Sequence, residues 1–325
     1  MKAYSSRFIA ALGDLNVKTY STATLEVNTV LEWLWDVAVD PVLNELGFTQ
    51  MPSPNMAWPR VWWVGCGLLN ILPIHAAGYH DSPNFRSAID RVISSYAPTL
   101  KALAYSRERR KACNVRHQKA MLVGMTNTPG LSDLPFVERE IEELQRLLPS
   151  RIQTTVIQEP TKKNVISTLS EHQIIHLSCH GSSSETDPSQ SKVFLKDAPL
   201  IVSDLASLNL ESAEFAYLSA CLTATSRDLE LLDESIHLAS AILLVGYPSV
   251  IGSLWEVRDE RSPEIAKDVY TVMLGQGEYL DIERSAEGLH WAVRRLREKT
   301  RIIPGFARRG PNDPCIWASY IHLGV

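Results

Sequence analysis

Two side chains that can act together as a nucleophile and a base each follow an apolar segment of this sequence. His180 follows the segment Ile174–Cys179, and Cys221 follows the segment Phe215–Ala220. A thiol attacks a carbonyl carbon well only as a thiolate, and its ordinary pKa is about 8.5. A nearby imidazole can accept the thiol proton, or stabilise the thiolate as an ion pair, and later protonate a leaving amine. These residue types in this pattern predict hydrolysis of peptide bonds by a cysteine nucleophile.

Such an attack also produces a negatively charged oxygen, which must be stabilised. Backbone N–H groups at the ends of strands can donate hydrogen bonds to it. Gly181 follows His180 directly, and glycine lets a chain turn sharply and a substrate approach closely. We therefore expect the backbone N–H groups of Gly181 and Cys221 to form the oxyanion site.

The elements that must position these residues are strands and helices that alternate from Lys119 onward. This alternation predicts βαβ units, a largely parallel sheet and helices on both of its faces. In such a sheet ligands bind beyond the carboxyl ends of the strands, where His180 and Cys221 are expected. If their strands are neighbours, the strand axes are about 4.8 Å apart and the two side chains can face each other. The strands are predicted at 120–125, 153–158, 173–179, 214–220, 249–254 and 316–323, and the helices at 136–148, 162–169, 234–245, 264–274 and 282–299.

The first part of the chain has a less regular pattern. Apolar residues at helical spacing predict one long helix there, and Gly47 fits a stop after it. The charged run Arg107–Lys111 marks the end of this part, so we predict two halves, residues 1–113 and residues 114–325. The predicted elements of the first half are a helix at 22–46, strands at 60–64 and 69–75, a short element at 86–95 and a helix at 98–110.

The composition sets limits on compartment and partners. The chain has 325 residues, a net charge of −5 and 45% hydrophobic residues, values that are typical of a globular protein and do not favour nucleic-acid binding. Its five cysteines are odd in number and irregular in spacing, so we predict reduced thiols and a cytoplasmic protein. No apolar run approaches the roughly 18 residues of a membrane span, and the start of the chain lacks a signal-peptide pattern. We expect no binding of a membrane, nucleic acid, metal or cofactor.

Several motifs around His180 and Cys221 resemble those of the CHAT proteases, a caspase-like group related to separase. Ser219-Ala220-Cys221 is a one-residue variant of the caspase Q-A-C signature, and His180 precedes Cys221 by 41 residues, where caspases have about 50. Two motifs farther upstream resemble fungal members of the group. The matching segments are His176–Gly181, Leu218–Cys221, Asp233–Glu234, Val250–Trp255, Pro314–Tyr320, Leu72–Gly78 and Ser94–Thr99.

The resemblance implies a caspase-like α/β fold in which residues 1–113 are a degenerate partner of the catalytic half, residues 114–325. It implies peptide hydrolysis, with His180 as the acid and base and Cys221 as the nucleophile. Many relatives carry this domain after helical repeats or a nucleotide-dependent switch. A regulatory protein partner or an attached sensor module, in a signalling, cell-death or defence pathway, is therefore also expected.

Other functions fit parts of this pattern. A pseudoprotease would keep the fold and signal by contact, although the intact pair of His180 and Cys221 argues against it, and an acyl transferase could use the same thiol. A zinc site would need ligands such as His176, Cys179, His180 and Cys221. However, His176 and Cys179 point to opposite faces of a strand, and His176 and His180 are about 13 Å apart. We therefore assign His176, Cys179 and also His75 to the packed interior.

A substrate is expected to bind as an extended strand along an exposed strand edge. The predicted place is the segment that follows 249–254, with Ser253 and Trp255 in contact with the substrate. The polar loop Ser182–Lys192 and the segment Thr223–Leu232 follow the two catalytic candidates, so both should border the site and control access to it. Acidic candidates for holding a basic substrate side chain are Glu185, Asp187, Asp228 and Asp259.

Overall fold

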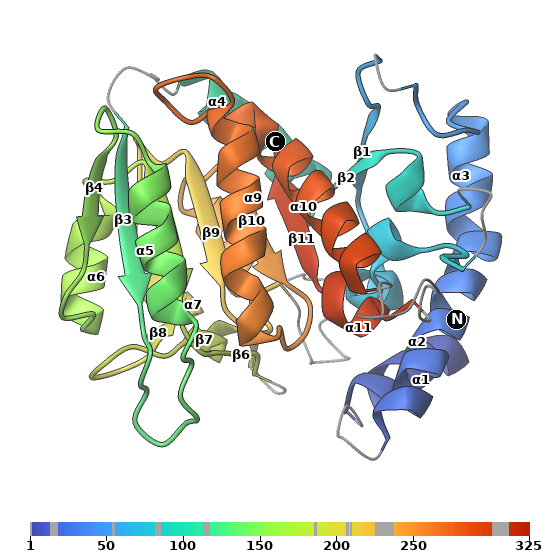
Figure 1. Ribbon diagram of the computed structural model, residues 1–325, viewed down its shortest axis with the longest axis horizontal. Helices are drawn as coiled ribbons and strands as arrows, with labels where there is room; N and C mark the ends of the chain where they lie inside the picture. The colour runs from blue at the N-terminus through green and yellow to red at the C-terminus, as the bar shows by residue number, and fades with distance from the viewer. Residues whose placement is uncertain are drawn as a thin grey trace.

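A mixed sheet of mostly parallel strands forms the centre of the protein, and helices cover its faces (Figure 1). The computed structural model describes residues 2–13, 19–53, 56–81, 86–112, 118–184, 187–205, 208, 210–224, 237–300 and 312–325. Within these residues the sheet has eight strands in the order β1-β2-β11-β10-β9-β5-β3-β4. The α/β fold with a mainly parallel sheet, predicted from the alternation of strands and helices, is confirmed.

The strands fall into two groups that run in opposite directions. One group is parallel throughout: β3 (Lys119–Gly124), β4 (Gln153–Val156), β5 (Ile174–Ser178), β9 (Phe215–Ser219) and β10 (Ser249–Ser253). The other group follows the one antiparallel pairing of the described sheet, between β10 and β11: β11 (Tyr320–Gly324), β2 (Ile93–Tyr96) and β1 (Arg60–Trp63). The carboxyl ends of β5, β9 and β10 therefore share one edge of the sheet.

The burial of the central strands explains their sequences. Every residue of β5 and of β10 is buried, because helices cover both faces of the sheet there. Strands of that kind have continuous apolar runs instead of an alternation of apolar and polar residues. Ile174, Ile175 and Leu177 of β5 and Val250 and Ile251 of β10 have this character.

The helices form two layers. Helices α5 (Val137–Leu147), α9 (Ser262–Leu274) and α10 (Ser285–Thr300) pack side by side in front of the sheet, and α4 (Leu100–Ala112) lies behind it with α8 (Leu238–Leu244) (Figure 1). Helix α5 buries one stripe and has acidic residues in its first turn and Arg146 in its last, as the helix dipole favours. The shorter helices are α6 (Lys162–Leu169), α7 (Val202–Leu205) and α11 (Pro314–Trp317).

A small antiparallel sheet follows the candidate histidine. Its strands in the described chain are β6 (Gly181–Ser182), β7 (Lys192–Val193) and β8 (Leu200–Ile201). The loop predicted at Ser182–Lys192 is therefore the connection of a hairpin, and its residues 185–186 lie outside the described ranges. Most of the segment Thr223–Leu232, residues 225–232, also lies outside them.

Helices at the amino end pack beside the β1–β2 edge of the sheet (Figure 1). The helix predicted at 22–46 is confirmed as α2 (Tyr20–Leu34), a π-helical turn at Trp35–Val39 and α3 (Asp40–Glu45). Pro41, in the first turn of α3, has no backbone N–H to donate within the helix, which accounts for the change in winding before it. Helix α1 (Lys2–Gly13) was not predicted.

Two of the predicted strands are wrong in whole or in part. The segment 69–75 forms two short 3₁₀ helices, Gly67–Ile71 and Ile74–Ala76, because Pro73 interrupts the run and the hydrogen bonds close locally. The segment predicted at 316–323 begins as α11, where Pro314 occupies a first-turn position that suits proline, and only then enters β11.

Strands from both predicted halves join the same sheet, since β2 pairs with β11. The division between residues 1–113 and 114–325 stays a prediction, and residues 113–117 lie outside the described chain. Among the described helices, none has the length and apolar character needed to cross a membrane.

Candidate active site

Strands β5 and β9 bring the two catalytic candidates to the same edge at the same height. The strands are parallel neighbours, and Ser178 is the register partner of Ser219. His180 lies two residues beyond Ser178, and Cys221 lies two residues beyond Ser219. A last backbone hydrogen bond, from the Cys179 N–H to the Ser219 carbonyl at 3.3 Å, closes the ladder just before them.

Gly181 lies directly against the backbone of Cys221. A Cβ atom at position 181 would come within 2.3 Å of the Cys221 carbonyl oxygen, a distance that real side chains do not adopt. Gly181 faces Val193 across the β6–β7 pair, and the Phe194 N–H donates to the His180 carbonyl at 2.9 Å. This pattern makes Gly181 and Val193 a non-hydrogen-bonded pair, so the ladder leaves the Gly181 N–H unused.

The ring of His180 is oriented by a backbone carbonyl from a distant loop. Its Nε2 atom is 2.7 Å from the carbonyl oxygen of Ser132, in the loop after β3. Because a carbonyl oxygen can only accept, we assign the proton of the neutral ring to Nε2 and the lone pair to Nδ1. The ring is partly exposed at the sheet edge. It therefore presents Nδ1 as a base.

The thiol of Cys221 is mostly buried and is held by the loop after β10. The backbone N–H of Val257 donates to Sγ at 3.4 Å. Burial raises the pKa of the Cys221 thiol; the Val257 N–H opposes this shift, while Glu256 and Asp259 add to it. The thiol is therefore neutral near pH 7 unless a base takes its proton.

Asp259 is the acidic candidate that lies near both residues. Its carboxylate accepts a hydrogen bond from the Phe136 N–H at 3.0 Å, just before α5. Burial raises the pKa of Asp259, and the nearby His180 lowers it. Asp187, by contrast, is exposed and accepts hydrogen bonds from Ser189 within its own loop. The remaining acidic candidates, Glu185 and Asp228, lie outside the described residues.

The side chains of Ser253 and Trp255 do not face solvent, contrary to the expectation that they contact substrate. Ser253 is fully buried, and its hydroxyl donates to the Ala220 carbonyl at 2.7 Å. Trp255 is 3% exposed; its indole packs against Phe8 of α1 and donates to the Cys315 carbonyl at 3.0 Å. Strand β10 is also an inner strand, paired on both sides. The exposed backbone begins only after Trp255.

Ser253 instead helps to hold the turn that carries Cys221. The Ser253 N–H donates to the hydroxyl of Thr223, and the Ala224 N–H donates to the Ser253 carbonyl. Between these contacts, Leu222 has a φ of 57°, a left-handed conformation that is costly for a residue with a side chain. The turn after Cys221 is therefore fixed by bonds to the end of β10.

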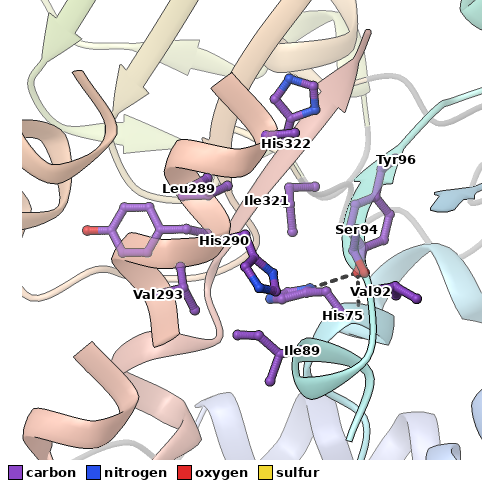
Figure 2. A pocket seen from close by; sticks show the side chains of 12 residues that line it. His75, Ile89, Val92, Ser94, Tyr96, Leu289, His290, Val293, Ile321 and His322 are labelled. Carbon is purple, nitrogen blue, oxygen red and sulfur yellow. Dashed lines mark hydrogen bonds between the residues drawn. The ribbon is translucent and has the colours of Figure 1, made fainter. Parts of the chain in front are cut away.

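The other histidines and cysteine considered as site residues, His75, His176 and Cys179, lie in the interior. Burial raises the pKa of Cys179 to about 12. His176 is fully buried and donates from Nε2 to Glu140 at 3.1 Å. The Nδ1 atom of His75 is 2.8 Å from the hydroxyl oxygen of Tyr96, and His75 lines a cavity of about 20 Å³ between β2, β11 and α10 (Figure 2). The assignment of these three residues to packed positions is confirmed.

Three contributors to the site were missed by sequence reasoning. Two are backbone groups, the Ser132 carbonyl and the Val257 N–H, which any residue type can supply, so the sequence contains no signal for them. The third is Glu140, whose carboxylate is buried beside the site. It could have been found, because it is a charged residue within the buried stripe of α5.

The fold is similar to those of separase and the cysteine proteinase gingipain R. The match to a chain of the Saccharomyces cerevisiae separase–securin complex has 13% identity and a TM-score of 0.54, and covers 81% of this chain and 15% of that chain. The match to the Arg-specific cysteine proteinase gingipain R has 11% identity and a TM-score of 0.53, and covers 94% and 74%. The complex of the pro- and mature domains of RgpB from Porphyromonas gingivalis matches with 12% identity and a TM-score of 0.51, covering 95% and 76%.

Residues 28–325 match the CHAT domain, and the chain therefore belongs to the CHAT domain family. This confirms the resemblance to the group, while a fungal type stays a prediction. No curated protein matches the sequence. The chain spans only 15% of the separase-complex chain that it matches, so the likeness to that chain concerns the fold.

Proposed function

We propose that the protein is a cysteine endopeptidase in which His180 is the acid and base and Cys221 is the nucleophile. The observation that carries the proposal is the register of β5 and β9. It brings an imidazole and a thiol to equivalent positions, two residues beyond the paired residues Ser178 and Ser219. The proposal is supported by the contact of His180 Nε2 with the Ser132 carbonyl, which assigns the lone pair to Nδ1, by the raised pKa of the Cys221 thiol and by the close approach of Gly181 to Cys221.

The reaction follows from these groups. Nδ1 of His180 takes the proton of Cys221 while Sγ forms a bond to the substrate carbonyl carbon. The carbonyl oxygen becomes an oxyanion and accepts hydrogen bonds from the N–H groups of Gly181 and Cys221. The C–N bond then breaks, the leaving amine takes the proton from His180, and a thioester remains. Water, deprotonated by His180, hydrolyses the thioester and restores the thiol.

An extended peptide would bind along residues 256–258, which follow β10 beside the thiol. Glu256 and Asp259 place negative charge near Cys221, which favours a basic substrate side chain at the cleaved bond. The Arg specificity of gingipain R agrees with this preference. A regulatory protein partner is proposed as well, because separase is found in complex with securin and because the resting thiol here is buried.

The test compares Cys221→Ala and His180→Ala with Cys66→Ala, which removes an exposed free thiol. A fluorogenic peptide with arginine before the cleaved amide and a peptidyl acyloxymethyl ketone are the probes. Wild type and Cys66→Ala should cleave the peptide and react with the ketone, and the two site variants should do neither. A wild-type protein that reacts with neither probe would favour the pseudoprotease instead. Transfer of the acyl group to an amine in place of water would indicate an acyl transferase.

A further inference from the structure

A buried carboxylate lies directly beneath the ends of β5 and β9. Glu140 projects from α5, is 1% exposed and accepts three side-chain hydrogen bonds. Its Oε2 atom accepts the hydroxyl of Ser178 at 2.7 Å and the hydroxyl of Ser219 at 3.1 Å. Its Oε1 atom accepts the Nε2–H of His176 at 3.1 Å. One side chain thus joins a helix to two neighbouring strands.

Ser178 and Ser219 hold equivalent positions at the ends of β5 and β9. They are register partners, and each precedes a catalytic candidate by two residues. Both donate to the same oxygen atom of Glu140, so that atom defines how far apart the two strand ends lie. We propose that Glu140 is a positioning residue that fixes the spacing of His180 and Cys221. This inference rests on the proposed function of that pair.

The geometry suits a carboxylate in particular. Hydrogen bonds to an ionised acceptor are shorter and stronger than bonds between neutral groups. A buried charge also has to keep its partners, because leaving it unpaired is strongly unfavourable. The serine side chains are short, so their donors can reach Oε2 only from a narrow range of backbone positions. The carboxylate therefore opposes both separation and slippage of the strand ends.

The carboxylate itself is held in place from the side. The ring of His176 stacks on Tyr217 with centroids 4.8 Å apart, and its Nδ1 is 3.4 Å from the hydroxyl of Tyr270 in α9. The negative charge of Glu140 also reaches the site: it contributes to the raised pKa values of Asp259 and Cys179. Removing this charge therefore weakens the hydrogen bonds from Ser178 and Ser219 and changes the electrostatics around Asp259 and Cys179.

The test uses Glu140→Gln, with Glu142→Gln as the matched control. Both residues belong to α5, but Glu142 is exposed and forms an ion pair with Arg146. Two further variants, Ser178→Ala and Ser219→Ala, each remove one hydroxyl and keep the carboxylate, and they serve if Glu140→Gln does not fold. Circular dichroism and thermal melting establish that each variant is folded at the assay temperature.

Two readouts are measured on the folded variants. The first is kcat and KM on the fluorogenic arginyl peptide. The second is the pH profile for alkylation of Cys221 by iodoacetamide, followed by mass spectrometry of the peptide that contains it. The second readout needs no peptidase activity. It therefore tests the role of Glu140 even if the proposed function fails.

For Glu140→Gln we expect kcat to fall about tenfold or more with little change in KM, since small misplacements of reacting groups have effects of this size. The alkylation profile of Cys221 should shift, and each serine variant should show part of both effects. Combining Glu140→Gln with Ser219→Ala should add little, because the two residues act as one unit. Folded Glu140→Gln and serine variants with the kcat and alkylation profile of Glu142→Gln would overturn the proposal.

Discussion

The carbonyl oxygen of Cys221 lies against Gly181 so closely that a Cβ atom at position 181 would come within 2.3 Å of it. The contact is between backbone atoms, so it cannot be relieved by the rotation of a side chain. It ties the chain that leaves β5 to the chain that leaves β9. The relative position of the two strand ends is therefore specified by a glycine as well as by the hydrogen bonds of the sheet.

The first prediction concerns the variant Gly181→Ala. The added methyl group has to push the Cys221 carbonyl away, which moves Sγ and the proposed oxyanion donors together. We expect kcat/KM on the fluorogenic peptide to fall at least about 100-fold, since a misplacement of about 1 Å can have an effect of this size. Steady-state kinetics measures the change.

The control for this variant is Gly13→Ala, at the end of α1, where a Cβ would meet no atom within 4 Å. It should leave kcat/KM unchanged. Near wild-type activity of a folded Gly181→Ala protein would mean that the contact with Cys221 is not needed for the reaction.

The second prediction tests whether Ser253 supports the turn that carries Cys221 or contacts the substrate. Its buried hydroxyl binds the Ala220 carbonyl and so supports the turn that carries Cys221. Ser253→Ala should lower the free energy of unfolding by about 0.5–1.5 kcal/mol, the net contribution of one hydrogen bond, because the Ala220 carbonyl keeps the hydroxyl of Thr223 as a donor. It should lower kcat and leave KM nearly unchanged, because the hydroxyl does not reach the substrate.

Ser249→Ala is the matched control, because Ser249 lies at the other end of β10 and its hydroxyl bonds His322 and Ser285. A similar loss of stability with unchanged kcat is expected for it. A Ser253→Ala protein with a raised KM and unchanged stability would restore the original assignment of Ser253 to substrate binding.

His180 and Cys221 can be identified from the sequence, whereas most of the groups that hold them cannot. Strands buried on both faces have continuous apolar runs, so the ends of β5 and β9 could be located, and the residues at those ends could be named. The carbonyl of Ser132 could not be identified from the sequence, because it comes from a loop 48 residues away and any residue type can supply a backbone carbonyl. Ser253 and Trp255 were placed correctly along the chain, but their burial depends on Ala220 and Phe8, which contact them only in the folded protein.

The third prediction concerns the charges around the thiol. Glu256 is exposed and contributes to the raised pKa of Cys221. Glu256→Gln should lower that pKa and increase the thiolate fraction near neutral pH. We expect alkylation of Cys221 by iodoacetamide at pH 7.5 to become roughly two- to fivefold faster, as for a solvent-screened interaction between charges. Mass spectrometry of the peptide that contains Cys221 follows the rate.

Glu260→Gln is the control for this rate, because Glu260 is also exposed and pairs with Arg261. It should leave the rate unchanged. Equal rates for wild type and Glu256→Gln would show that the Glu256 carboxylate does not act on the thiol in solution.

The fourth prediction concerns stability at acid pH. Three buried histidines, His75, His290 and His322, line the cavity shown in Figure 2. Burial lowers the pKa of His75 to about 3 and lowers the pKa values of His290 and His322 well below the usual 6.5. Arg294 lowers the pKa of His290 further, and Arg60 lowers that of His322, against a smaller opposing effect of Asp90 on His290.

These histidines are neutral in the folded protein and take up protons on unfolding below pH 6.5. Above pH 6.5 these histidines therefore do not reduce the free energy of unfolding. As the pH falls from 6.5 toward the folded pKa values, the free energy of unfolding decreases. Each histidine lowers the free energy of unfolding by up to about 1.4 kcal/mol per pH unit in that range. Urea unfolding at several pH values between 7.5 and 5 should show this steep decline.

The variants His290→Leu and Val293→Ala distinguish this cause from a general loss of packing. Both residues lie on α10 and line the same cavity. His290→Leu should make the decline with pH shallower by about one proton, since a leucine takes up none on unfolding. Val293→Ala should lower stability by a similar amount at every pH, because it removes buried methyl groups and changes no titrating group. If His290→Leu declines as steeply as wild type while Val293→Ala behaves as expected, the imidazole of His290 is not a source of the acid sensitivity.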